Sequence, residues 1–213
     1  MYEIAHRGFS DLHKDNTMEA FHSAIEHNFD MIELDIQLTR DNQVIIYHDT
    51  FIGDKLIRNM NVDEVQALDN DIVTLKYFFS NIDLKKVCVY LDIKGSDFIC
   101  IYLHQILKNI MNRNKILIGC FNLKLLERLY ELDSAYNLGI ITENVFPNEI
   151  INHYINRINL AFVSFHWTVL NHQAIRFLQM KGILVFTYTC KNQDIKSFIE
   201  EYNVDGIVTN YKF

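Results

Sequence analysis

The sequence predicts a (β/α)8 barrel, the TIM-barrel architecture of the α/β class, with a small hairpin inserted after the second strand. Short apolar runs rich in β-branched and aromatic residues alternate with longer segments of helical period, which is typical of parallel strands joined by crossover helices. Eight such runs occur in 213 residues, the number that a compact barrel needs. One proline, seven glycines and no Pro/Gly/Ser-rich linker predict a single domain over residues 1–213.

The eight predicted strands follow one another along the whole chain. An open, doubly wound sheet is the main alternative for the same alternation of elements. The strands are predicted over residues 2–7, 31–38, 86–94, 116–121, 136–142, 159–166, 183–189 and 206–210.

Helices are predicted between most of these strands. Asn16 or Thr17 is suited to cap the first, Asn122 caps another, and Pro147 suits a first helical position. Gly182 is a suitable helix stop before the seventh strand. The predicted helices run from 17 to about 27, over 123–132, from 147 onward, and over 171–180 and 192–202, with two short ones over 62–68 and 74–82.

The segment after the second strand breaks this rhythm. It reads as strand, polar turn and strand, which predicts a hairpin. With the turn centred near Asn42, antiparallel pairing would set Ile36 opposite His48. The second strand would thereby return His48 to the level of Glu33 and Asp35.

Composition excludes several classes of protein. The net charge of −7 and the pI near 5.7 argue against nucleic-acid binding, which calls for a basic patch. No apolar run approaches the roughly 18 residues of a membrane span, and no signal peptide is recognisable, so we expect no stable membrane insertion and a cytoplasmic location. Four scattered cysteines within apolar runs are typical of buried thiols in a reducing compartment.

Reactive side chains gather at the carboxyl ends of the first three strands and on the hairpin, where the active site of a barrel lies. Glu33 and Asp35 are two residues apart on one strand, so both face the same way. Taken alone they could be a polar strand edge paired with helix cations. Three enclosed carboxylates repel one another unless a cation joins them, and oxygen ligands without thiolates suit Mg²⁺ or Ca²⁺, with Mn²⁺ also possible. The set comprises His6, Arg7, Glu33, Asp35, His48, Asp92 and Lys94.

Two histidines beside such a metal site predict acid–base chemistry. One imidazole can remove a proton from the attacking hydroxyl while the other protonates the leaving oxygen. Arg7 and Lys94 add fixed positive charge for a phosphate. Together these groups predict phosphoryl transfer.

The motifs resemble those of the glycerophosphodiester phosphodiesterase family in order and spacing, over essentially the whole chain. Residues 4–49 carry the most specific part of the resemblance. The matching positions are His6-Arg7-Gly8, Asn16-Thr17, Ala20-Phe21, Ala24, Ile32-Glu33-Leu34-Asp35, Gln37, Thr39, Asp41, His48-Asp49, Thr74-Leu75, Asp92-Ile93-Lys94, Cys120-Phe121, residues 185–189 and residues 205–209.

The resemblance implies metal-dependent hydrolysis of glycerophosphodiesters to glycerol 3-phosphate and an alcohol. It suggests one divalent cation on three carboxylates and an acid–base pair of histidines. It also suggests cationic phosphate clamps, with Asn16 among the substrate-binding residues. The implied roles are metal ligation for Glu33, Asp35 and Asp92, catalysis for His6 and His48, and phosphate binding for Arg7 and Lys94.

Aromatic residues at three strand ends are further candidates for substrate binding. Phe121 and Tyr188 are expected to form the apolar wall of the cleft. Trp167 could pack on a glycerol or head group, or simply beneath a loop. Glu143, after the fifth strand, could reach inward or be a solvated loop carboxylate.

The sequence departs from the family pattern at several positions. Lys14-Asp15 replace the usual Pro-Glu, and Asp92 stands where glutamate is usual, one methylene shorter. Tyr188 replaces a tryptophan and Asn210 an aspartate, and the stretch after Asp49 is shorter and lacks an Arg-Thr-Thr-Asn-Gly run. None of these changes removes a charged catalytic group.

Two alternative functions remain open at this level. One is a phospholipase D-like activity on lysophospholipids or sphingomyelin, for which Phe51 and Ile52 are the only hint of an apolar rim. The other is a catalytically silent barrel that binds phosphate ligands. The sequence predicts a small-molecule substrate, and it leaves protein partners, the alcohol moiety and the metal undetermined.

Overall fold

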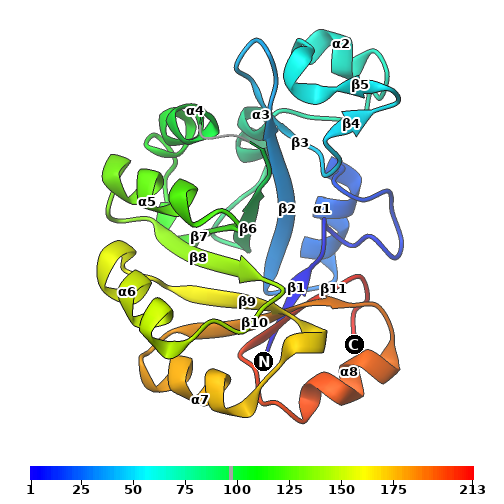
Figure 1. The fold of residues 1–213 in the computed structure, drawn as a ribbon. Helices are drawn as coiled ribbons and strands as arrows, with labels where there is room; N and C mark the ends of the chain where they lie inside the picture. Colours follow the sequence, from blue (N-terminus) through cyan, green and yellow to red (C-terminus); the bar gives the residue numbers. More distant parts are fainter. Residues whose placement is uncertain (96–97) are drawn as a thin grey trace.

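The computed structural model describes residues 1–95 and 98–213, and their main sheet closes into a barrel (Figure 1). The ring runs β1-β11-β10-β9-β8-β7-β6-β2 with every neighbouring pair parallel, and β2 also pairs with β1. This closure confirms the predicted (β/α)8 barrel and excludes an open doubly wound sheet. The eight strands of the ring are β1 (Tyr2–Ala5), β2 (Met31–Leu38), β6 (Cys88–Ile93), β7 (Ile116–Cys120), β8 (Asn137–Thr142), β9 (Phe162–His166), β10 (Leu184–Cys190) and β11 (Gly206–Thr209).

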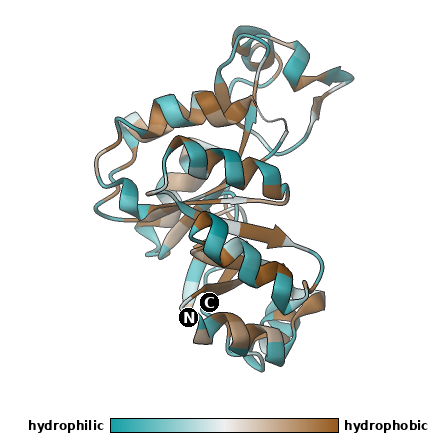
Figure 2. Cartoon of the chain, turned by 60° about the vertical axis from the view of Figure 1, so that its left-hand side comes forward, coloured by the Kyte–Doolittle hydropathy of each residue, from teal (hydrophilic) through white to brown (hydrophobic). Residues whose placement is uncertain are grey.

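The helices surround the barrel and alternate hydrophobic with hydrophilic residues (Figure 2). Side-chain caps fix several of their starts: Thr17 accepts a hydrogen bond from the Ala20 amide, and Asn122 accepts one from the Lys124 amide. The main helices are α1 (Met18–Glu26), α3 (Leu75–Asn81), α4 (Ile99–Leu107), α5 (Leu123–Leu132), α6 (Asn148–Ile158), α7 (His172–Met180) and α8 (Gln193–Glu200), with short 3₁₀ turns η2 (Arg113–Lys115) and η3 (Trp167–Val169). No helix among the described residues is both long and apolar enough to cross a membrane.

Two helix predictions need correction. Pro147 is the N-cap of α6 rather than its first residue. Helix α4 lies between the third and fourth ring strands, in a region for which the sequence pattern predicted no helix. Its sequence, Ile-Cys-Ile-Tyr-Leu-His-Gln-Ile-Leu, is apolar on most sides, so an amphipathic period is hard to see.

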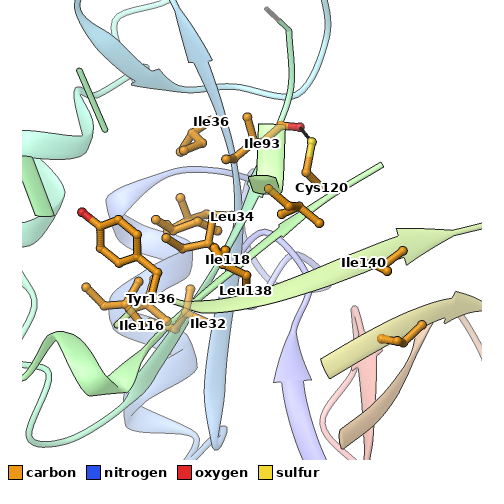
Figure 3. Close-up of a cluster of buried hydrophobic side chains, with 14 of the residues drawn as sticks. Ile32, Leu34, Ile36, Ile93, Ile116, Ile118, Cys120, Tyr136, Leu138 and Ile140 are labelled. Atoms are coloured by element: carbon orange, nitrogen blue, oxygen red, sulfur yellow. Dashed lines mark hydrogen bonds between the residues drawn. The ribbon is translucent and has the colours of Figure 1, made fainter. Parts of the chain in front are cut away.

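The main core lies between the sheet and the helices. Ile32, Leu34 and Ile36 lie on one side of β2 next to Ile118 and Leu138 (Figure 3). Because side chains alternate along a strand, Glu33 and Asp35 face the barrel interior instead. Packing of the apolar face therefore sets the direction of the two carboxylates.

A second, smaller cluster of apolar side chains fills the inside of the barrel. It contains the rings of Tyr90, Phe162 and Phe186, with Tyr90 and Phe162 in an edge-to-face contact at 5.0 Å. A Cβ atom built on Gly139 would lie 2.2 Å from the Phe162 ring. Glycine is therefore required where this ring crosses the barrel.

The hairpin after β2 is present, but its register differs from the prediction. Strand β3 (Val44–Ile46) sets Ile46, not His48, opposite Ile36. Thr39 closes a tighter turn, since its amide donates to the Gln43 carbonyl and the Asn42 amide donates to the Thr39 carbonyl. The Tyr47 amide donates to the Asp35 carbonyl at 3.0 Å, so the following His48 still reaches the mouth of the barrel.

The rest of the insertion forms a small cap. Ile45, Ile52 and Ile57 lie in its own apolar cluster with residues of α2 and the segment before α3. Figure 1 shows this cap at the upper end of β2 and β3. Its elements are β4 (Phe51–Ile52), β5 (Lys55–Leu56), η1 (Ile57–Asn59) and α2 (Val62–Gln66).

Candidate active site

One pocket of about 230 Å³ opens at the carboxyl ends of the ring strands. Parallel strands end at the same rim, so residues far apart in sequence converge there. All seven ionisable residues singled out from the sequence line this pocket, namely His6, Arg7, Glu33, Asp35, His48, Asp92 and Lys94.

The acidic residues form a compact group. Asp35 and Asp92 are direct cross-strand partners, and Glu33 lies two residues back on β2. One carboxylate oxygen from each residue lies within 4.8 Å of the others. Their exposed fractions are only 4%, 2% and 8% for Glu33, Asp35 and Asp92.

The hydrogen bonds of this group leave room for a cation. Glu33 Oε2 accepts from the Arg7 amide at 2.9 Å, and Asp35 Oδ2 accepts from Asn16 Nδ2 at 2.9 Å. Asp92 Oδ2 accepts from Lys94 Nζ at 2.7 Å, while Asp92 Oδ1 is buried and accepts no hydrogen bond from residues 1–95 and 98–213. A buried carboxylate oxygen without a donor, in an all-oxygen set, fits a hard divalent cation.

The pKa values show the cost of holding three carboxylates together. Burial, followed by the charges of Asp35 and Asp92, raises the pKa of Glu33 well above its ordinary value. Burial also raises the pKa of Asp92 to about 7. Burial works in the same direction on Asp35, but Lys94 and Arg7 outweigh it and hold the pKa of Asp35 below its ordinary value. The group therefore needs either a proton or a cation to remain together at neutral pH.

Each histidine is held through its Nδ1 atom. His6 Nδ1 lies 2.7 Å from Asn210 Oδ1, and His48 Nδ1 lies 2.7 Å from Asp49 Oδ1. Since both partners are acceptors, Nδ1 carries the proton and Nε2 is left for the pocket. Burial, and then the charge of Arg7, lowers the pKa of His6 to about 4, so His6 is neutral at pH 7.

The two cationic residues are paired with carboxylates. Arg7 has a positive φ of 58°, and its Nε and Nη1 atoms lie 3.0 and 2.9 Å from Asp35 and Asp15. Lys94 Nζ lies 2.7 Å from Asp92 and 3.3 Å from Asp35. Asp15, at a position where the sequence departs from the family pattern, thus keeps a carboxylate beside Arg7.

Comparison with known proteins decides the family. The model of the glycerophosphoryl diester phosphodiesterase family matches residues 6–212. The chain belongs to this family. The predicted family and its enzymatic class, a phosphoric diester hydrolase acting on glycerophosphodiesters, are confirmed.

Relatives of this phosphodiesterase match over nearly their whole length. YhdW of Bacillus subtilis (strain 168), provisionally named a glycerophosphodiester phosphodiesterase, is 30% identical, with 99% of this chain and 95% of the relative covered. The crystal structure of a glycerophosphodiester phosphodiesterase from Thermotoga maritima is 26% identical, with a TM-score of 0.84 and coverage of 99% and 94%. An Oleispira antarctica phosphodiesterase, solved in complex with the product sn-glycerol-3-phosphate, has a TM-score of 0.88 at 20% identity, with coverage of 99% and 93%.

Asn16, predicted among the substrate-binding residues, lies differently in this phosphodiesterase. It is buried and does not line the 230 Å³ pocket. Its Nδ2 atom donates to Asp35, and its Oδ1 atom lies 3.3 Å from the Asp35 amide as acceptor. Asn16 thus holds a candidate metal ligand in place. It also lines an adjoining pocket of about 180 Å³ together with Arg7 and His48, and substrate binding by Asn16 stays a prediction.

The three predicted aromatic residues divide into two groups. Phe121 and Tyr188 line the pocket, with ring centroids 6.2 Å apart at nearly right angles. Trp167 does not line it, because its ring packs edge-to-face on Phe198 of α8 at 5.8 Å. The structure shows a packing contact for Trp167, and its contact with a head group stays a prediction.

Sequence reasoning did not assign three polar residues to the site, although it noted one of them, Asn210, as a departure from the family pattern. Asn210 and Lys191 directly follow ring strands, so the rule of strand ends could have found them. Ser164 lies inside β9, is fully buried, and lines the pocket together with Tyr90. Glu143, left open between an inward and a solvated position, also lines the pocket.

Proposed function

We propose that this family member hydrolyses glycerophosphodiesters to glycerol 3-phosphate and an alcohol, with one divalent cation and an acid–base pair of histidines. One observation carries the proposal: three carboxylates within 4.8 Å of one another share a single pocket with two imidazoles held through Nδ1. The sn-glycerol-3-phosphate bound to the Oleispira antarctica relative supports this product.

Glu33, Asp35 and Asp92 would hold the cation, for which Mg²⁺ and Ca²⁺ are the first candidates and Mn²⁺ a third. When bound, such an ion withdraws charge from a phosphoryl oxygen and so stabilises the charge that develops there. Asn16 and the Arg7 amide would keep Asp35 and Glu33 in place for it.

His6 is the better candidate for the base. Its imidazole is neutral at pH 7 because burial lowers its pKa to about 4, so Nε2 can accept the proton of the attacking hydroxyl. His48, whose Nδ1 is held by Asp49, would act in its doubly protonated form and donate the Nε2 proton to the leaving alcohol oxygen. One proton enters at His6 and one leaves from His48, so the pair is reset by exchange with water.

Arg7 and Lys94 keep positive charge beside the position of the phosphate. In the described structure both form ion pairs with carboxylates, which hold the two side chains at the rim. Their charges would offset the negative charge that accumulates as the phosphoryl group is transferred.

Nothing in the described residues favours the phospholipase D-like alternative over this reaction. Phe51 is exposed, as an apolar rim would require, but Ile52 is buried in the cluster of the cap. The silent-barrel alternative predicts ligand binding without turnover, although both histidines are retained in the pocket.

Release of glycerol 3-phosphate from glycerophosphocholine tests the proposal directly. We expect turnover with Mg²⁺ or Ca²⁺, its loss with EDTA, and its loss in His6→Ala. His153→Ala, an exposed histidine on α6, is the matched control and should retain full activity. Turnover confined to lysophosphatidylcholine would favour the phospholipase D-like reaction, and binding without turnover under every metal would favour the silent barrel.

A further inference from the structure

Lys191 is a third cation of the 230 Å³ pocket and has no role in the reaction as described above. It directly follows β10, the seventh strand of the ring counted from β1, whereas Lys94 follows β6, the third. In an eight-stranded ring the third and seventh strands face each other. The two lysines therefore approach the pocket from opposite sides, and loops after the seventh and eighth strands of such barrels often bind phosphate.

The charge of Lys191 is free for a ligand. Arg7 and Lys94 are engaged with Asp15, Asp35 and Asp92, but no carboxylate lies within ion-pair distance of Lys191 anywhere in residues 1–95 and 98–213. It is the only cation of the pocket lining without such a partner in this part of the chain.

The backbone on both sides of Lys191 is fixed. The Cys190 carbonyl accepts from Thr209 Oγ1 at 3.1 Å and from the Asn210 amide at 3.4 Å. On the other side, the Asn192 side chain caps α8 by accepting from the Ile195 amide at 2.9 Å. The ammonium group thus extends from an anchored point on the rim rather than from a loose loop.

The ligand of the pocket needs such a charge. Four carboxylates line the pocket, and the whole chain has a net charge of −7, so an anionic substrate is attracted by any cation that no carboxylate neutralises. A phosphodiester carries one negative charge, and glycerol 3-phosphate carries nearly two at neutral pH. An ammonium group donates charge-assisted hydrogen bonds to phosphate oxygens.

We propose that Lys191 is a further phosphate-binding residue, which contacts the phosphoryl group of substrate and product from the side of the pocket opposite Lys94. This inference rests on the proposed function. The competing assignment is that Lys191 binds a carboxylate on the alcohol half of the substrate, as in glycerophosphoserine, rather than the phosphoryl group.

Lys191→Met and Lys191→Arg separate these assignments. We expect Lys191→Met to raise KM about 5- to 30-fold for glycerophosphocholine, glycerophosphoglycerol and glycerophosphoserine alike, because a charged hydrogen bond is lost from the shared phosphoryl group. Lys191→Arg should restore KM to within about threefold, since it keeps the charge. An effect of Lys191→Met on glycerophosphoserine alone would overturn the proposal.

Lys181→Met is the matched control. Lys181 is exposed and follows α7 just before β10, at the opposite end of the barrel, so this variant removes the same charge away from the pocket. Its KM should equal that of the unaltered protein at both low and high ionic strength. Equal behaviour of Lys191→Met and Lys181→Met would exclude a direct contact and leave only long-range attraction.

Binding of sn-glycerol 3-phosphate to the Mg²⁺-loaded protein, measured by calorimetry, does not depend on turnover. We expect Lys191→Met to weaken this binding by the same factor as KM, and to weaken binding of inorganic phosphate in parallel. If the unaltered protein binds both ligands but hydrolyses no diester, the proposed function fails while Lys191 is still tested. If Lys191→Met binds both as tightly as the unaltered protein, the assignment of Lys191 is wrong whatever the activity.

Discussion

His6 Nδ1 lies 2.7 Å from Asn210 Oδ1, although the two residues are 204 positions apart. Strands β1 and β11 pair in parallel with Ala5 opposite Thr209, so the next residue of each strand comes to the same point of the rim. An amide oxygen orients the imidazole without adding negative charge beside it. Asn210 stands where the family pattern has an aspartate, and in this chain the His6 imidazole stays neutral beside it at pH 7.

Replacing Asn210 by aspartate should raise the pKa of His6, because a carboxylate stabilises the protonated imidazole. As the base works only when neutral, the acidic limb of the kcat/KM profile should move from about pH 4 toward neutral pH. Asn210→Ala should lower kcat about 100-fold because the His6 imidazole is no longer oriented, while the pKa of His6 stays low. Profiles that coincide for all three proteins would show that Asn210 does not act on His6.

His48→Ala should lower kcat about 10²- to 10⁴-fold for glycerophosphocholine, since the leaving alkoxide then receives no proton. A glycerophosphodiester with a 4-nitrophenyl leaving group needs no such proton and should lose far less. Asp49→Asn should show a smaller loss, again larger for glycerophosphocholine than for the 4-nitrophenyl diester. The reason is that His48 keeps its place but loses a charged acceptor. Steady-state rates on both substrates check this, and equal losses on the two would assign His48 to another step.

Affinity for the metal should rise with pH between about 5 and 8. Burial raises the pKa of Glu33 and brings that of Asp92 to about 7, so at lower pH a proton occupies the group and must leave before the cation binds. Titration calorimetry with Mg²⁺ in buffers of different ionisation heat would detect the released protons. Asp92→Asn should remove the part of this dependence near pH 7 and weaken binding, whereas a pH-independent affinity would contradict the grouping of the three carboxylates.

Gly139→Ala should destabilise the barrel by about 1–3 kcal/mol, because the new Cβ overlaps the Phe162 ring inside it. Adding Phe162→Leu to Gly139→Ala should recover part of this loss, while Phe162→Leu alone should cost stability through the space it leaves. Urea unfolding of the four proteins gives the coupling between the two positions. Additive changes in the free energy of unfolding would show that the Phe162 ring does not clash with a Cβ atom at position 139.

The sequence by itself determined the class of fold, the capping of several helices and the convergence of the charged residues. These features depend on local patterns: the alternation that points Ile32 and Leu34 outward points Glu33 inward, whatever the rest of the chain does. Once eight strands are assigned, a barrel brings their carboxyl ends to one rim, so the order of the residues along the chain is enough to group His6, Glu33 and Asp92.

Only the tertiary structure decided the contacts that orient these residues. The register of the hairpin depends on a turn that is tighter than predicted, and strand pairing by itself does not place His48. The hydrogen bond between His6 and Asn210 depends on closure of the barrel between its first and last strands. Asn16 donates a hydrogen bond to Asp35 and does not line the 230 Å³ pocket, Trp167 packs on α8, and Lys191 has no carboxylate partner among the described residues. Each of these outcomes depends on distances between segments far apart in the chain, which local propensity does not encode.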